Sequence, residues 1–110
     1  MSPEDIAIIG YCAPKTGRED ECHKLAKELI ESTWAEDEGC ICYYFYQKSE
    51  NPNEWIFHER WRDRDALMAH TQRLRAVYGP GDPNSKTPGL PAAIMEPWEK
   101  FELSGLTPVA

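Results

Sequence analysis

Residues 58–70 read HERWRDRDALMAH, and this stretch contains the end of a predicted strand and the start of a predicted helix. The strand is EWIFHERW (54–61), in which alternate side chains share a face. One face carries Trp55, Phe57, Glu59 and Trp61, and the other carries Ile56, His58 and Arg60. Because His58 and Glu59 point to opposite sides, the stretch is not the helical HExxH motif of a zinc protease.

The helix predicted over residues 63–78 begins at Asp63, a residue type that caps helices. Apolar positions recur in it at intervals of three and four, as on the buried face of an amphipathic helix. That face contains Ala66, Leu67, His70, Leu74 and Val77. A single histidine there is either a core residue bonded to a backbone carbonyl or a functional group that faces a cleft.

A strand and a helix are predicted upstream of this junction. Residues 5–13, DIAIIGYCA, are a short apolar run typical of a buried strand. Thr16 and Glu19 stand three apart in TGRE, which predicts a capping box at the start of a helix over residues 17–34. The apolar stripe of this helix is Cys22, Leu25, Ala26, Leu29, Ile30 and Thr33.

The aromatic segment CICYYFYQK (40–48) predicts another strand, joined to residues 54–61 as a hairpin by the polar loop SENPN. It is apolar on both faces: Cys40, Cys42, Tyr44 and Tyr46 on one, and Ile41, Tyr43 and Phe45 on the other. A sheet covered by helices on one side should be polar on its free side. We therefore expect a homodimer in which the sheet faces of two copies cover each other.

The C-terminal third is rich in proline and glycine. A long loop is predicted over residues 79–92, with a short helical turn around LPAAIM, then a last strand over 97–103 and a tail over 104–110. The resulting order is β-α-β-β-α-β. This order predicts an α+β, ferredoxin-like fold with one antiparallel sheet and two helices on one face.

The chain has 110 residues and a formal net charge of −7, with 41% hydrophobic and 28% charged residues. This length suits a single domain over residues 1–110. A surface of that charge would repel nucleic acid and anionic membranes, so neither is an expected partner. No apolar run reaches the roughly 20 residues that span a bilayer. The N-terminus lacks the basic start of a signal peptide, so we expect a cytoplasmic protein.

The four cysteines, Cys12, Cys22, Cys40 and Cys42, could form two disulfides, a metal site or free thiols. Alternation along a strand predicts that Cys40 and Cys42 share a face. Zinc sites favour two to four residues between paired cysteines, and the chain has neither a CxxC motif nor a paired histidine motif. We expect free, mostly buried thiols in a reducing compartment.

Several of these segments, taken together, resemble the antibiotic biosynthesis monooxygenase family of dimeric α+β barrels. The segments are IAIIGYC, KTGRED, EGCICYYFYQ, ENPNEW and ERWRDRDALMAH. In the last one the family pattern is Glu-x-Trp, an acidic cap, Ala-Leu and His. Its counterparts here are Glu59, Trp61, Asp63, Ala66, Leu67 and His70. The likeness covers residues 5–78, and the last strand matches loosely.

The resemblance implies an oxygenase that needs no metal, flavin or other cofactor and acts on a small quinol or polyphenol. The substrate is deprotonated and its anion reduces O₂ directly, in a dry aromatic pocket with a base and donors for the oxyanion. It implies His70 as base or oxyanion donor and Glu59 as the residue that orients it. The substrate-binding residues would be Trp61, Tyr43 and Phe57. Each also has an acceptable structural role, so a non-catalytic, small-molecule-binding or stress-related dimer is the alternative.

Overall fold

The computed structural model describes residues 4–81, 89–95 and 99–104. Within these residues four strands form one antiparallel sheet in the order β2-β3-β1-β4. The strands are β1 (Ile6–Cys12), β2 (Cys40–Gln47), β3 (Trp55–Trp61) and β4 (Glu99–Ser104). This sheet and the helices that cover it confirm the predicted ferredoxin-like α+β fold.

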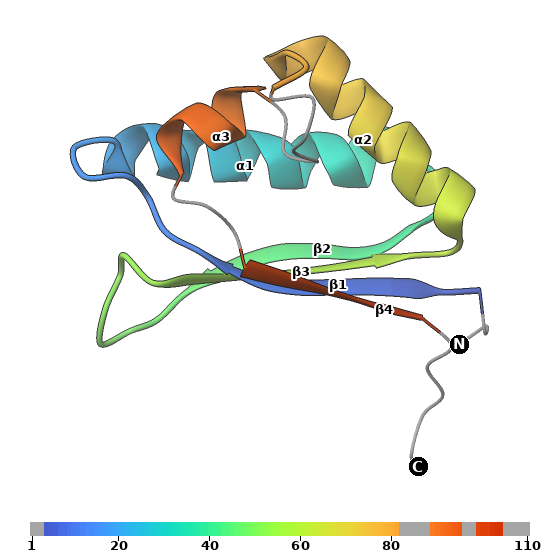
Figure 1. Ribbon diagram of the computed structural model, residues 1–110, viewed down its shortest axis with the longest axis horizontal. Coiled ribbons are helices and arrows are strands. Elements are labelled where there is room, and N and C mark those ends of the chain that lie inside the picture. The colour runs from blue at the N-terminus through green and yellow to red at the C-terminus, as the bar shows by residue number, and fades with distance from the viewer. Residues whose placement is uncertain (1–3, 82–88, 96–98, 105–110) are drawn as a thin grey trace.

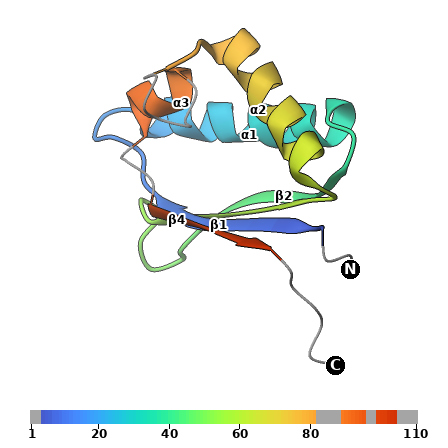
Figure 2. The same ribbon diagram turned by 45° about the vertical axis from the view of Figure 1, so that its right-hand side comes forward.

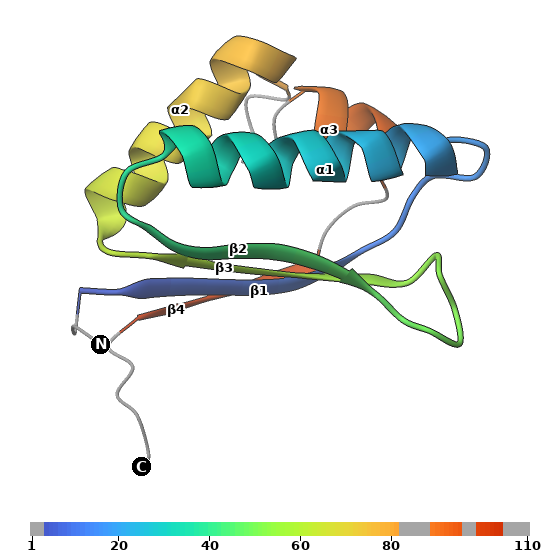
Figure 3. The same ribbon diagram turned by 180° about the vertical axis from the view of Figure 1, so that it is seen from behind.

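Helices α1 (Glu19–Glu36), α2 (Arg64–Tyr78) and α3 (Gly89–Ile94) all lie on one side of the sheet (Figure 1). Figures 2 and 3 show that no described helix lies on the opposite side. The core therefore fills the space between sheet and helices, where Trp61, Phe57 and Leu29 are fully buried. Within the described residues, none of the helices has the length and apolar character needed to cross a bilayer.

The buried side of α1 follows the stripe that the sequence predicts. Its buried residues are Cys22, Leu25, Ala26, Leu29 and Thr33, and Ile30 packs partly against the core. The predicted capping box is wrong, because Gly17, at φ 84°, turns the chain after Thr16 and the helix begins only at Glu19. The carboxylate of Glu19 instead accepts a hydrogen bond from the backbone N–H of Gly17 at 3.0 Å.

Asp63 caps α2 as predicted. Its Oδ1 atom accepts a hydrogen bond from the backbone N–H of Ala66 at 2.9 Å. Ala66, His70 and Leu74 are buried, and Leu67 is partly buried. Val77, which the periodicity places on the same face, is exposed. That prediction is wrong because α2 rises away from the sheet toward its C-terminal end (Figure 1).

A bulge in β2 separates the faces of its first residues. Cys40 pairs with Trp61, but Cys42 pairs with Arg60, so the register shifts by one residue between them. Ladder partners share a face, so Cys40 lies with Trp61 on the side of the helices and Cys42 lies with Arg60 on the free side. The prediction that Cys40 and Cys42 share a face is therefore wrong. It failed because a bulge shifts the alternation by one residue.

The free face of the sheet is largely apolar. Its exposed side chains include Ile9, Tyr11, Tyr44, Tyr46, Phe101 and Leu103. Tyr43 is buried and Phe45 is half-buried, and both pack into the core on the side of the helices. From Tyr43 onward, β2 therefore carries apolar side chains on both faces, as the sequence predicts.

The C-terminal segments end differently from the prediction. The helical turn around LPAAIM is the short helix α3, so the predicted loop over 79–92 ends before residue 89. The backbone N–H of Lys15 donates to the carbonyl of Ile94 at 2.9 Å and ties the end of α3 to the loop after β1. The last strand is present as β4. Residues 82–88 of the loop and 105–110 of the tail lie outside the described residues.

Candidate functional site

The trio selected from the sequence meets in the core. Strand β3 directs Glu59 and Trp61 toward the helices, and α2 directs His70 toward the sheet. The indole N–H of Trp61 donates to Oε1 of Glu59 at 3.0 Å, and the rings of Trp61 and His70 have centroids 4.5 Å apart. Nε2 of His70 lies 3.8 Å from Oε1 of Glu59, which is beyond hydrogen-bond distance.

The carboxylate that holds His70 is Asp37, which the sequence did not indicate. Its Oδ2 atom lies 2.6 Å from Nδ1 of His70. Arg73, one turn after His70 on α2, donates to the same carboxylate from Nε at 2.6 Å and from its terminal NH2 at 2.8 Å. Asp37 therefore joins the end of α1 to α2 through three short hydrogen bonds.

The charges of this cluster fix the tautomer of His70. Burial alone would raise the pKa of Asp37, but hydrogen bonds from Arg73 and His70 outweigh burial and hold that pKa below its usual value. Burial lowers the pKa of His70, and the contact with Asp37 opposes this shift without cancelling it. His70 is therefore neutral at pH 7. Because an ionised Asp37 can only accept, Nδ1 of His70 carries the proton and Nε2 is the free acceptor.

Tyr43 and Phe57, the other predicted substrate-binding residues, line the same interior. The ring of Tyr43 lies 5.3 Å from that of His70 and 6.5 Å from that of Trp61, both edge-on. Phe57 is buried one strand away, with its ring centroid 6.1 Å from that of Phe45. Burial raises the pKa of Tyr43 well above its usual value, so its hydroxyl stays protonated. His70 is thus buried against aromatic rings, with the charged groups of Asp37 and Glu59 near its two nitrogens.

One signal in the sequence could have revealed Asp37. Gly39 follows it at φ 85°, and a Cβ atom at Gly39 would lie 2.6 Å from Cβ of Ala66 at the start of α2. Its carbonyl accepts a hydrogen bond from the backbone N–H of Arg62 at 2.8 Å. This close approach of the α1–β2 turn to the β3–α2 junction places Asp37 beside His70. In the sequence, Gly39 shows only as a residue that interrupts the helical pattern.

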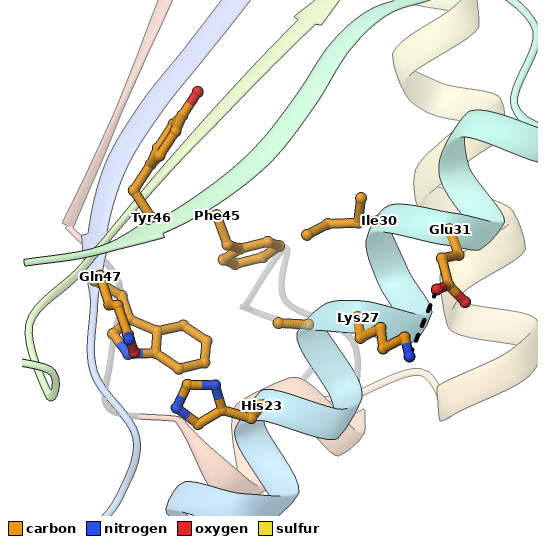
Figure 4. A pocket seen from close by; sticks show the side chains of 9 residues that line it. His23, Lys27, Ile30, Glu31, Phe45, Tyr46 and Gln47 are labelled. Atoms are coloured by element: carbon orange, nitrogen blue, oxygen red, sulfur yellow. Dashed lines mark ion pairs between the residues drawn. The ribbon is translucent and has the colours of Figure 1, made fainter.

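An open pocket of about 350 Å³ lies elsewhere, between α1 and the strands β2 and β3 (Figure 4). Its lining residues are His23, Ala26, Lys27, Ile30 and Glu31 from α1, with Phe45, Tyr46, Gln47 and Trp55 from the strands. None of the site residues predicted from the sequence lines it. The sequence does not indicate His23, because this residue lies outside the apolar stripe, on the polar side of the helix.

The pocket and the buried cluster share a wall. The ring of Phe45 forms part of the pocket lining, and its centroid lies 5.8 Å from that of Tyr43 on the interior side. Tyr43 in turn contacts His70. Two aromatic side chains therefore separate the pocket from the imidazole of His70.

The four cysteines are free thiols. Burial raises the pKa of Cys12 to about 12 and that of Cys40 to about 11, so both are protonated at neutral pH. Sγ of Cys42 lies 3.7 Å from Nδ1 of His58 on the free face of the sheet. Among the described residues, no group of three or more His, Cys, Asp or Glu side chains is arranged to hold a metal ion.

Comparison with known proteins places the chain in a family. The family model described as antibiotic biosynthesis monooxygenase matches residues 5–75. An uncharacterized protein from Synechocystis is 35% identical over 69 residues, which are 63% of this chain and 46% of that protein. The matched part thus spans less than half of that relative's length.

Two solved structures share the fold. A conserved protein from Methanosarcina mazei is 25% identical, with a TM-score of 0.72 and 93% of each chain covered. A variant of SnoaB, a cofactor-independent oxygenase from Streptomyces nogalater, is 13% identical, with a TM-score of 0.66, 96% of this chain covered and 97% of that chain. The family match spans both central strands, β2, α1 and most of α2. This chain is a member of the antibiotic biosynthesis monooxygenase family.

Proposed function

We propose that this protein is a cofactor-independent monooxygenase that oxidises a quinol- or polyphenol-type aromatic with O₂. The observation that carries the proposal is the neutral His70, fixed by Asp37 in an aromatic interior within a chain of this family. A base that is neutral at pH 7 can take a phenolic proton, and a dry surrounding strengthens its interactions. The likeness to a cofactor-independent oxygenase supports the same class of reaction.

In the proposed reaction, Nε2 of His70 takes the proton of a phenolic hydroxyl. The resulting anion gives electrons to O₂. In the overall change, a ring CH₂ group of the keto tautomer becomes a C=O group that contains one oxygen atom of O₂. The other oxygen atom leaves as water, together with the two hydrogens of that CH₂ group. The substrate supplies all four electrons, so the reaction needs no other reductant. Glu59, 3.8 Å from Nε2, would stabilise the imidazolium, and Trp61, Tyr43 and Phe57 would surround the ring.

Substrate entry makes a structural demand. His70 is only 4% exposed, and Phe45 and Tyr43 lie between it and the pocket. The proposal therefore requires these two rings to turn aside when the substrate enters. Closure of the rings behind the substrate would exclude water from the anion.

Oxygen consumption tests the proposal. Wild-type protein is mixed with a panel of quinols and anthrones, and O₂ uptake is followed with an electrode. We expect uptake with at least one compound, and a loss of about 100-fold or more in His70→Gln, the scale of a positioned base. Gln72→Ala, an exposed change on the same helix, should keep full activity. Full activity in His70→Gln, or no uptake with any compound, would overturn the proposal.

A second candidate is a non-catalytic binding protein of the same fold. The observation that favours it is that the open pocket lies away from the closed cluster around His70. In that case Asp37, His70 and Arg73 only join α1 to α2. Ligand binding without O₂ uptake would support this candidate.

We further propose that the protein is a homodimer that pairs the free faces of two sheets. The support is the exposed apolar surface on that face, which includes Ile9, Tyr11, Tyr44, Tyr46, Phe101 and Leu103. An apolar face of this kind on a soluble domain marks an interaction site. Light scattering should give twice the monomer mass, and Tyr44→Lys with Phe101→Lys should give the monomer mass. A monomeric wild type at micromolar concentration would overturn the dimer.

A further inference from the structure

We propose that the pocket between α1, β2 and β3 binds a planar phenolic ligand, with His23 bonded to the phenolic oxygen and Phe45 and Trp55 against the ring. The choice of a phenol rests on the proposed function, whereas the position of the site rests on the pocket itself. Its volume of about 350 Å³ falls within the roughly 300–1,000 Å³ typical of small-molecule sites.

Two aromatic side chains in the lining favour a flat ligand, and most of their accessible surface belongs to Phe45, because Trp55 is only 3% exposed. The rings of Phe45 and Trp55 have centroids 6.2 Å apart and stand at 70° to each other. A planar ring stacked on Phe45 would direct its edge at the exposed part of Trp55, and both stacked and edge-on arrangements are favourable for aromatic pairs. Ile30 and Ala26 from α1 add apolar surface opposite the strands.

His23 is placed to read a hydroxyl group at the edge of this ring. Its imidazole lies edge-on to Trp55, with centroids 5.0 Å apart at 66°, so one side of the imidazole contacts another residue of the pocket lining. The side chain is nevertheless exposed. An imidazole nitrogen can accept a phenolic proton or donate to a phenolate, which suits both protonation states of the ligand.

The remaining polar groups lie around the rim. Figure 4 shows Gln47 and Lys27 on opposite sides of Phe45, whereas Tyr46 is directed away from it, so Tyr46 adds little to the interior of the pocket. Nζ of Lys27 is 4.0 Å from Oε1 of Glu31, and both side chains are exposed. Such a pair is weak, so Lys27 is available to an anionic ligand.

The pocket also stands at the entrance to the interior. Phe45 lines the pocket on one side and packs against Tyr43 on the other, and Tyr43 contacts His70. A phenol held here would be separated from His70 by the rings of Phe45 and Tyr43, the two rings that must turn aside in the proposed reaction. This makes the pocket the docking position from which a substrate would enter.

Binding is tested without oxygen chemistry, with 2-naphthol as the probe and 2-methoxynaphthalene, which lacks the hydroxyl proton, as its matched comparison. Affinities are measured by titration under anaerobic conditions, and the site is located from backbone amide shifts. We expect shifts at residues 23–31 and 45–47, and about 3- to 10-fold tighter binding of 2-naphthol, the effect of one hydrogen bond.

Two variants of His23 distinguish the contribution of its aromatic ring to binding from that of its ring nitrogens. His23→Phe keeps an aromatic ring beside Trp55 and should bind both compounds equally. His23→Ala should lose the preference and also bind both compounds more weakly. Lys27→Ala should weaken the binding of the naphtholate anion at high pH. Lys24→Ala, which changes an exposed lysine outside the pocket lining, should leave that binding unchanged.

The outcomes distinguish this site from the proposed reaction. Three results would overturn the phenol site, even if the protein consumes O₂ with quinols. They are amide shifts confined to other residues, no binding at millimolar probe, and a preference for 2-naphthol that is unchanged in His23→Phe. Binding as described in a protein that never consumes O₂ would support the site and overturn the proposed reaction.

Discussion

Nδ1 of His70 lies 2.6 Å from Oδ2 of Asp37, although 33 residues separate the two along the chain. The contact joins the turn after α1 to the middle of α2, directly above the sheet. It fixes the ring orientation of His70 and leaves Nε2 directed toward Glu59. Any role of His70 in catalysis or in stability therefore depends on Asp37.

Asp37→Ala should destabilise the fold. It removes the buried carboxylate that pairs with Arg73, whose side chain is only 21% exposed, and leaves that charge with Glu36, whose side chain is exposed, as its carboxylate partner. Removing one partner of a partly buried ion pair lowers the free energy of unfolding by about 3 kcal/mol. Glu36→Ala, which removes the exposed partner of Arg73 at 3.5 Å, should cost less than about 1 kcal/mol. Urea unfolding curves of the two variants provide the measurement, and equal losses would contradict the assignment.

Stability should fall as pH drops below about 6.5, because of His70. Burial lowers the pKa of His70 in the folded state relative to its ordinary value of 6.5. The unfolded chain therefore takes up the proton first, so the stabilising contribution is present above pH 6.5 and is lost as pH falls through the lower folded pKa. His70→Gln should show a smaller slope in the same range. If the free energy of unfolding changes with pH equally in the wild type and in His70→Gln, His70 is not buried in its neutral form.

The fold was largely predictable because it follows from periodicity. Alternation along EWIFHERW and the helical stripe from Cys22 to Thr33 placed both faces correctly, since each element buries one side. The errors arose where one residue changes the local geometry. Gly17 displaced the predicted cap at Thr16, and the bulge at the start of β2 moved Cys40 and Cys42 to opposite faces.

The candidate site was only half predictable. Glu59, Trp61 and His70 come from one continuous segment, so strand and helix phase alone bring them together. Asp37 belongs to a different loop, and its distance from His70 depends on how the α1–β2 turn packs against α2. His23 lies on the polar side of a helix, and only the three-dimensional arrangement shows that a pocket opens beside it. Apart from Gly39, these contacts between distant segments leave no local signal in the sequence.

Gly39→Ala should be strongly destabilising. The residue has φ 85°, and the added Cβ would lie 2.6 Å from Cβ of Ala66. Backbone strain of this kind costs about 1–3 kcal/mol, and the clash adds to it. Gly17→Ala is the matched control, since φ is 84° but no atom lies within 4 Å, so its loss should be the smaller one. Thermal unfolding of both variants decides, and a Gly39 variant as stable as the Gly17 variant would contradict the close packing of the turn.

Cys12 should resist alkylation in the folded protein. Burial raises the pKa of its thiol to about 12, so almost no thiolate is present at about pH 8. Iodoacetamide labelling followed by peptide mass spectrometry should show Cys12 modified in urea and unmodified under native conditions. Cys42, which is half-buried on the free face, should react faster than Cys12 in the native protein. Equal rates for the two would contradict the burial of Cys12.

Product analysis under heavy-isotope O₂ tests the central claim most directly. An active quinol or anthrone from the oxygen-uptake panel is converted by wild type and by His70→Gln, and the product mass is measured. We predict that one heavy oxygen atom enters the wild-type product, and that His70→Gln forms it at least about 100-fold more slowly. A product without heavy oxygen, or one formed equally fast by His70→Gln, would contradict a monooxygenase centred on His70.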